Sequence, residues 1–507
     1  MDRFTIHYCD SEKVVNIEFG NGLYTSAYTI GFNGGTLDVR YSGCLSGITA
    51  DTALTYTIDS VNQVITFTVP ANTSYDDITY NFRAVFCDDT YADAIIEQGA
   101  YVAIDYLRFK PISADCYFMI DFGSGSEKSV QYSLDGGGTW TTLSNHRWSS
   151  IVPVGKTILW KGNNTASTTY GVGIFSSSGG TFEAKGNPMS LASGDSFDEA
   201  TTLADYQFYK LFSACTKLVK ADEINLPITT LANYCYAGMF HGCKITTAPE
   251  LPATTLASNC YRSMFHDCYS LTTAPELPAT TLAEHCYMGM FGNCRSLTTA
   301  PELPATTMAV GCYMAMFEGC GSLTPAPVLP ATTLAAYCYS SMFAGCGSLT
   351  TAPALPVTTL AVQCYDGMFN MCTGLTTAPD LPATTLANEC YRDMFAFCTS
   401  LTTPPVMSAT TLADYCCYRM FYNCSSLTTA PVLYAETLVL NCYNQMFSNC
   451  SSLNSVTCLL TGGSSGANTD HWLYLVAAGG TFTKKRGAYY YSTVSGIPNG
   501  WTVIEVD

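Results

Sequence analysis

Cysteine and histidine are the residues of this chain with the most recognisable chemistry, and their spacing decides what they can do. The 507 residues include 25 cysteines and six histidines. Most cysteines come in pairs eight residues apart, such as Cys260 and Cys268. On one helix that spacing spans about 12 Å, whereas a disulfide needs Cα atoms within about 7 Å, and zinc ligands usually sit two to four residues apart. We therefore expect free thiols that act as small buried apolar groups, in a protein made in a reducing cytoplasm.

No arrangement of residues predicts catalysis. The histidines share no local motif with a nucleophile, and no glycine-rich loop precedes a helix to cradle a phosphate. His241 and His266 occupy equivalent positions of a repeat, which favours a solvated pair over a metal site. Glu250, Glu276 and Glu302 also share one position, and stacked carboxylates could hold Ca²⁺, but no Asp or Asn lies nearby. We expect no enzyme activity, no cofactor and no bound metal.

The composition excludes several classes of protein. The chain has 22 basic and 40 acidic residues, a net charge of -18, and only 12% charged residues, about half of the usual share. It lacks the clustered Lys and Arg that track a phosphate backbone, so we expect no nucleic-acid partner. It also lacks a run of about 20 apolar residues, so we expect no membrane insertion. Residues 1–10 do not show the apolar stretch of a secretory signal.

A repeat of 26 residues dominates the second half of the chain, and ten copies cover about residues 200–455. Phe212 opens a degenerate first copy, and Phe240 lies 25 residues before the regular series. The phenylalanines at intervals of 26 are Phe265, Phe291, Phe317, Phe343, Phe369, Phe395, Phe421 and Phe447. Such periodicity predicts a solenoid in which each unit contacts only its neighbours.

One half of each unit has the pattern of an amphipathic helix of about three turns. Leu282, Cys286 and Met290 follow one another at four-residue spacing. Thr281 and Glu284 match a capping box, in which the side chain of each residue accepts a hydrogen bond from the backbone N–H of the other. We therefore expect one helix per unit.

The end of that helix and the other half of the unit are marked by special residues. Asn293 lies where a helix end favours a residue tolerant of positive φ, whereas Met371 and Phe397 break that rule. Residues 297–303 are Thr-rich and contain a proline, which cannot donate to a β-ladder. We expect a strand of three or four residues before it. Strands stack about 4.8 Å apart and helices pack 8–10 Å apart, which predicts a curve with the strands inside.

The repeats resemble a known family. The phrases MFxxCxSL and LPATTLAxxCY are similar to the bacterial leucine-rich repeats of the BspA type, which are about three residues shorter. The resemblance covers about half of the chain. It implies an α/β, leucine-rich-repeat-like solenoid of strand-helix units, and a role in surface display and adhesion rather than in chemistry.

The flanking segments are expected to be all-β. In the first of them we expect strands at residues 37–41 and 62–69 and a hairpin of 80–86 with 92–98. The phrases GGT, NFRAVF and IIEQGA resemble BACON domains, immunoglobulin-like modules common in proteins of gut Bacteroides-group bacteria and their phages. The expected domains are a BACON-like sandwich (1–100), a second β-sandwich (101–195), the solenoid (196–457) and a small β cap over the last repeat (458–507).

The second β domain carries the most informative tryptophans. The stretch Ser133–Trp140 matches the S-x-D-x-G-x-T-W Asp-box of sialidases, which is a hairpin turn remote from their catalytic centre. A single copy cannot make a propeller, so we expect a Gly-rich hairpin with Trp140 packed beneath it. Trp148, flanked by Arg147 and two serines, is the best candidate for an exposed ring that stacks on a sugar, although a place in the core is the more common one for a tryptophan.

A second set of candidate binding residues comes from variation between copies, because the positions after the repeat tyrosine change while the core does not. Exposure alone explains such drift, and a recognition face would vary in the same way. The candidate ligand-binding residues are Trp148, Arg262, Met288, Met314 and Arg392.

Two functions fit these expectations. The first is a non-enzymatic appendage of a phage virion, such as a tail or head fibre or spike. It would be made in the host cytoplasm, released by lysis, oligomeric, attached to other virion proteins, and would bind a host-surface or mucosal glycan or protein. The alternative is a bacterial cell-surface adhesin of the BspA type, which requires export.

Overall fold

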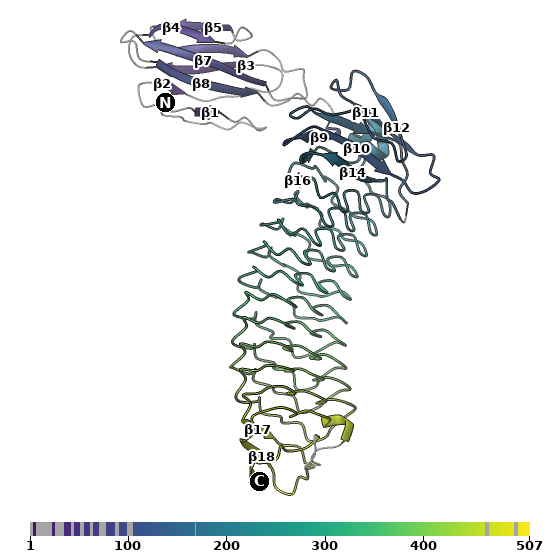
Figure 1. The fold of residues 1–507 in the computed structure, drawn as a ribbon, viewed down its shortest axis with the longest axis vertical. Coiled ribbons are helices and arrows are strands. Elements are labelled where there is room, and N and C mark those ends of the chain that lie inside the picture. Colours follow the sequence, from purple (N-terminus) through teal and green to yellow (C-terminus); the bar gives the residue numbers. More distant parts are fainter. Residues whose placement is uncertain are drawn as a thin grey trace. The chain divides into compact units, whose positions relative to one another are not determined.

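The computed structural model describes residues 105–167, 169–461, 466–490 and 495–507, together with the strands of the first hundred residues (Figure 1). Its contacts divide the chain into two compact units. The first unit comprises Met1–Tyr106, Ser133–Trp140 and Gly155–Leu159, and the second comprises Leu107–Tyr132, Thr141–Val154 and Trp160–Asp507. The finer division into four domains stays a prediction.

The first unit contains two four-stranded sheets, ordered β1-β8-β7-β4 and β2-β3-β6-β5. The predicted hairpin is confirmed as the antiparallel pair β7 and β8, and the two other predicted strands form as β3 and β6. Assignment to the BACON family stays a prediction. The strands are β1 (Phe4–Ile6), β2 (Leu23–Thr25), β3 (Gly35–Tyr41), β4 (Leu45–Ala50), β5 (Thr55–Asp59), β6 (Val64–Val69), β7 (Ile78–Phe86) and β8 (Tyr91–Gln98).

The second unit begins with a β region built around a cluster of aromatic rings. Phe109, Phe118, Trp160 and Phe175 are buried, and their ring centroids lie 4.9–6.2 Å apart. One sheet has the order β12-β11-β13-β9-β15-β16, and β10 pairs antiparallel with β14. The strands are β9 (Leu107–Pro111), β10 (Cys116–Asp121), β11 (Ser129–Ser133), β12 (Thr141–Ser144), β13 (Ile158–Lys161), β14 (Ile174–Gly179), β15 (Phe182–Lys185) and β16 (Leu218–Lys220).

The predicted helix of the repeat is wrong. Residues 221–454, all of them described, contain neither a helix nor a strand, and the segments predicted to be helical are runs of tight turns. We call such a segment a rung; residues 259–268 are one example. The helices in the described part of the chain are α1 (Ser190–Ser193) and the 3₁₀ helices η1 (Gly194–Glu199) and η2 (Gly466–Thr469). Within that part, no helix has the length and apolar character needed to cross a bilayer.

The backbone of a rung donates its hydrogen bonds alternately in two directions. Met264 donates to the carbonyl of Tyr261, three residues earlier, at 3.1 Å. Its neighbour Ser263 donates instead to the carbonyl of Met288 in the next rung, at 2.8 Å. Every fourth residue has a positive φ, and in this rung the values are 58° at Asn259, 53° at Ser263 and 60° at Asp267. The rungs therefore stack as a ladder of backbone bonds (Figure 1).

This geometry explains why the sequence resembles a helix. The rung repeats every four residues, close to the 3.6 of an α-helix, so Cys286 and Met290 are both buried at helical spacing. A helix, however, cannot accept a positive φ at every fourth residue. The capping box does not form, since no helix begins there and the side chain of Glu284 is 60% exposed. Half of the backbone N–H groups donate to carbonyls of the next rung, and the residue pattern within one repeat does not predict these hydrogen bonds.

The last residue with a positive φ in each rung allows a direct test of the turn conformation. Met371 and Phe397, which break the predicted rule, nevertheless have φ values of 59° and 62°. A residue with a side chain is destabilised by about 1–2 kcal/mol in the left-handed region of positive φ. Glycine avoids this strain, but its larger loss of backbone entropy on folding costs about 0.5–1 kcal/mol. We therefore expect Met371→Gly to raise the free energy of unfolding by about 0.5–1 kcal/mol, as measured by denaturant titration. Met314, whose φ is not positive, is the control: Met314→Gly should destabilise, and equal losses in both variants would contradict the assignment.

The Thr- and Pro-rich half of each unit, for example residues 271–281, forms what we call the Thr/Pro face. It pairs with its neighbours through parallel single-residue bridges such as Thr351↔Thr377 and Thr377↔Thr403, so the predicted strand of three or four residues is shortened to one. Threonine hydroxyls add bonds between units: Thr376 Oγ1 donates to the carbonyl of Thr350 at 3.3 Å. Full strands form only near the ends of the solenoid, at β16 and at β17 (Ser455–Cys458).

Stacked columns of buried side chains fill the core, and in three of them the same contact recurs from unit to unit. Neighbouring phenylalanine rings are 5.3–5.8 Å apart and nearly parallel, and neighbouring tyrosine rings are 5.7–6.2 Å apart. In the third column, nine cysteine thiols donate to the phenylalanine carbonyl of the preceding rung at 3.0–3.1 Å. These spacings are far below the 8–10 Å of packed helices, so the expected cause of curvature is absent.

The prediction of free, buried thiols is confirmed for the described residues, where every cysteine is unpaired and buried. Burial raises the pKa of the thiol of Cys268 to about 12, and it also raises the pKa of the thiols of Cys294 and Cys320 in the same column. They are therefore protonated at neutral pH, which leaves the S–H free to donate to a carbonyl and makes the sulfur a poor nucleophile.

The β region joins the first rung without a break. Phe175 in β14 donates to the carbonyl of Leu211 at 2.8 Å, and its ring stacks on Phe212 at 5.9 Å. In addition, β15 pairs in parallel with β16. The phenylalanine column thus runs into the aromatic core of the β region, which covers the apolar end of the solenoid as a capping segment must.

The C-terminal segment extends the ladder by one rung before closing it. Phe447 donates to the carbonyl of Trp472 at 2.9 Å, and His471 and Leu475 have the positive φ of a rung. The strand before this rung, β17, forms a parallel sheet with two strands that follow the rung, β18 (Thr481–Lys485) and β19 (Thr502–Val506). Trp472 is fully buried, and its Nε1 donates to the carbonyl of Gly496.

Candidate functional site

The stacked rungs place two pairs of variable residues per repeat on one side of the solenoid. In the pattern CYxxMFxxC, the named residues are buried, and the x positions are mostly exposed or half-buried. We call the surface made by these x positions the turn face. Side chains 25 or 26 residues apart in sequence become direct neighbours there, as the stacked rings of His241 and His266 show.

Four of the five predicted binding residues lie in a single column of the turn face, directly after the buried Tyr. Arg262 is exposed, with one long hydrogen bond of 3.4 Å to Asn259. Met288 and Met314 are half-buried, because neighbouring rungs cover part of each side chain. The side chain of Arg392 is 41% exposed. The fifth residue, Trp148, lies outside this column, in the β region.

The strongest cluster of charges on the turn face surrounds Arg392. Its guanidinium lies 2.6 Å from Glu389 and 3.6 Å from Asp393. Arg419 in the next rung also reaches Asp393, at 3.4 Å, and lies 4.4 Å from the ring centroid of Tyr422. Arginine and tyrosine held in place by such contacts are the residue types that dominate protein-binding hot spots.

Asp366, one rung before Arg392, gives this surface a pH dependence. Burial raises its pKa to about 7, against the opposing charge of Arg392. Because the folded-state pKa lies above the unfolded one, stability is complete at low pH and falls as the pH rises from about 4 to 7. We expect Asp366→Asn to remove this fall, so that its gain in unfolding free energy is about 2 kcal/mol larger at pH 8 than at pH 5. The exposed Asp222→Asn is the control for denaturant titration, and the same pH trend there would refute the assignment.

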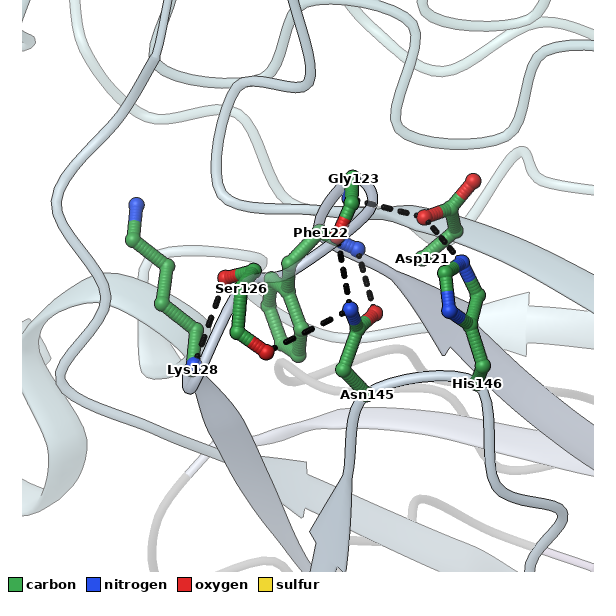
Figure 2. Close-up of polar contacts among 7 residues, drawn as sticks. All are labelled: Asp121, Phe122, Gly123, Ser126, Lys128, Asn145 and His146. Atoms are coloured by element: carbon green, nitrogen blue, oxygen red, sulfur yellow. Dashed lines mark hydrogen bonds and ion pairs between the residues drawn. The ribbon is translucent and has the colours of Figure 1, made fainter.

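Trp148 is held on a well-ordered loop of the β region. Its side chain is 47% exposed, the most of any described tryptophan. Figure 2 shows how the loop is fixed: Asn145 accepts from the N–H of Phe122 at 2.9 Å, and His146 contacts Asp121 at 2.7 Å. Asn145 also donates to the carbonyl of Gly123 at 2.7 Å (Figure 2). The structure therefore presents an exposed indole on a loop that hydrogen bonds support.

The Asp-box forms a compact turn between β11 and β12. Asp135 accepts from the N–H and the hydroxyl of Thr139 at 2.9 and 2.6 Å, and from the hydroxyl of Ser133 at 2.7 Å. These hydrogen bonds, that of the Thr139 hydroxyl foremost, lower the pKa of Asp135 to about 2. Trp140 is half-buried, with its ring 5.1 Å from that of Tyr106. The structural interpretation of this motif is confirmed.

One cluster on the turn face was missed by the sequence interpretation. His241, His266 and Asp267 each offer a ligand atom, and these atoms lie within 4.8 Å of one another. Burial and the neighbouring His266 lower the pKa of His241. Burial opposes ionisation of Asp267, but His266 and hydrogen bonds from Tyr269 and Asn293 outweigh it and lower the pKa. The detectable signal was an aspartate directly after the second of two histidines one repeat apart.

Comparison with known protein families identifies the repeats. The BspA type leucine rich repeat region matches in six copies, over residues 201–324, 284–428 and 393–461. Together these stretches cover 201–461, just over half of the chain. No curated protein and no solved structure gives a significant match. The protein is thus a repeat protein with strands and very few helices, and it belongs to the BspA-type leucine-rich repeat family.

Proposed function

We propose that this protein is a non-enzymatic attachment protein whose turn face binds a partner on a surface. The observation that carries the proposal is the contrast within each rung: the stacked columns stay constant, while the variable pairs of the turn face change from Arg262 to Met288, Asp366 and Arg392. A rigid ladder thus presents different chemistry at each step. The BspA-type family suggests the same role, surface adhesion or protein binding.

The partner is a host-surface protein or glycan. The cluster of Arg392, Arg419 and the rings beside them supports a protein contact. The exposed indole of Trp148 supports a glycan, because flat apolar rings stack on the C–H face of sugars. The proposal includes no substrate, cofactor or reaction.

The particle that displays the protein is a phage virion, on which the protein is a tail or head appendage joined to other virion proteins. The free, buried thiols of the described residues support folding in a reducing cytoplasm followed by release on lysis. Display on a bacterial cell, the alternative, requires passage through an oxidising compartment with these thiols intact.

A binding experiment tests the attachment role. Purified full-length protein is labelled and titrated onto candidate host cells. The variant Arg262→Glu/Arg392→Glu reverses charge on the turn face, and we expect it to bind at least ten times more weakly. The matched control, Val328→Glu/Val406→Glu, alters residues that are 80% and 63% exposed on the Thr/Pro face. This control should bind normally. Trp148→Ala should bind more weakly if the partner is a glycan that stacks on the indole. Equal binding by all of these variants would reject both surfaces.

A second experiment tests whether a phage virion or a bacterial cell displays the protein. Quantitative proteomics compares density-purified phage particles with washed cell envelopes from a producing culture. Enrichment in the particles is the expected result and establishes a virion appendage. Enrichment in the envelopes rejects it and makes the protein a cellular adhesin.

A further inference from the structure

Two histidines of adjacent rungs are stacked in the column after the buried Phe. The rings of His241 and His266 are 5.3 Å apart at an interplanar angle of 6°, and both are partly open to solvent on the turn face. The next residue in this column is Gly292, and a Cβ there would come within 2.5 Å of the His266 ring. Glycine therefore leaves room for the ring, and the pair of imidazoles ends at this rung.

A carboxylate completes the group. Asp267 Oδ2 lies 3.6 Å from His241 Nε2 and 3.2 Å from His266 Nδ1. A metal ion bound at about 2.0–2.1 Å in tetrahedral geometry separates its ligands by about 3.3 Å. Two of the three separations are therefore already close to those of a bound ion, and the third lies within 4.8 Å, so the imidazoles must turn toward each other to share one ion.

The surroundings orient the carboxylate for this purpose. The other oxygen, Asp267 Oδ1, accepts from the hydroxyl of Tyr269 and the amide of Asn293, both at 3.0 Å. Outer hydrogen bonds of this kind fix metal-binding carboxylates in known sites. Oδ2 remains directed at the imidazoles. His266 Nδ1 is buried as an atom, and its contact with Asp267 Oδ2 at 3.2 Å is not a well-aligned hydrogen bond.

We propose that His241, His266 and Asp267 form a binding site for a transition-metal ion of the Zn²⁺ class. Two imidazoles and one carboxylate suit zinc and its neighbours, whereas Ca²⁺ and Mg²⁺ prefer oxygen ligands throughout. Three protein ligands leave a coordination position free for water or for a group of a bound partner. The ion links two rungs that are otherwise joined by backbone bonds and core packing.

Zinc titration of the native full-length protein tests the site. Isothermal titration calorimetry with ZnCl₂ should show one ion per chain, and Co²⁺ in its place should give the visible absorption of a four-coordinate complex. We expect His241→Ala and His266→Ala each to weaken binding at least tenfold, with Asp267→Asn doing the same. Asn293→Ala removes only an outer hydrogen bond, so we expect a loss of about tenfold, smaller than the loss in each of the three ligand variants.

The controls separate this site from other sources of zinc binding. His471 also lies beside an aspartate, at 3.0 Å from Asp470, but no second histidine of the described residues lies with them. His471→Ala should therefore leave zinc binding unchanged. The cysteines of the described residues are buried and so are inaccessible to zinc while the protein stays native, which circular dichroism verifies for each variant. No saturable binding by the wild type, or binding unchanged in the variant His241→Ala/His266→Ala, would overturn the proposal. Both outcomes are independent of whether the protein attaches to a surface.

Discussion

Replacing Phe343 by alanine is expected to lower the free energy of unfolding by about 4 kcal/mol, within the range of 3–5 for buried phenylalanines. The ring is fully buried and stacks on Phe317 and Phe369, with centroids 5.8 Å away on both sides. Its loss leaves a cavity in the middle of the column, where neither neighbour can collapse without breaking its own stack. Denaturant titration followed by circular dichroism measures the change.

Phe397 provides the matched control because the same atoms are removed outside the core. Its ring lies half-buried on the turn face, beside Tyr422 at 5.4 Å. Phe397→Ala should cost less than about 1 kcal/mol, as surface substitutions usually do. Similar losses in both variants would show that the phenylalanine column is not the main support of the solenoid.

Truncation of Trp472 is expected to have the second largest effect, again about 3–5 kcal/mol, but confined to one end. This indole closes the last rung, where Phe482 and Tyr490 lie with ring centroids 5.9 and 6.3 Å away. Each unit of a solenoid contacts only its neighbours, so loss of the end frays the adjacent units first. In Trp472→Ala, hydrogen exchange should accelerate at residues 442–458 while residues 260–320 keep their protection.

The control for the end of the solenoid is Tyr474→Ala in the same rung. The ring of Tyr474 is 43% exposed, whereas its carbonyl, which the variant retains, accepts from Asn449 at 2.8 Å. Exchange rates at residues 442–458 should stay unchanged. If Trp472→Ala instead raised exchange evenly along the whole solenoid, the unit would unfold as one block and the C-terminal segment would have no special capping role.

Residue patterns located the core of the solenoid but not its conformation. The columns of Phe291, Tyr287 and Cys294 are buried as expected, and the positions expected to tolerate positive φ have it. The helix was wrong because a four-residue repeat of turns and a 3.6-residue helix bury nearly the same positions over ten residues. Only the direction of the N–H groups distinguishes them, and half of these bond to another rung.

The candidate sites divide in the same way. Trp148 was selected from its sequence neighbours and is exposed, and Arg262 and Arg392 lie on the predicted variable surface. Asp267 was not selected, since its partners within its own unit, His266 and Tyr269, do not by themselves make a metal site. It meets His241 because stacking brings residues 26 apart into contact, and their interaction depends on the side-chain geometry of two rungs.

The sequence by itself therefore determined the repeat period, the buried columns, the absence of disulfides among the described cysteines and the surface that varies. These properties depend on the residue type at each position, and burial favours the same apolar residues in either backbone. The tertiary structure alone decided that the units are turns, that the thiols donate to phenylalanine carbonyls, and that His241, His266 and Asp267 converge. Each of these depends on hydrogen bonds or contacts between neighbouring units, which are set by how the chain stacks and not by the order of residues within one repeat.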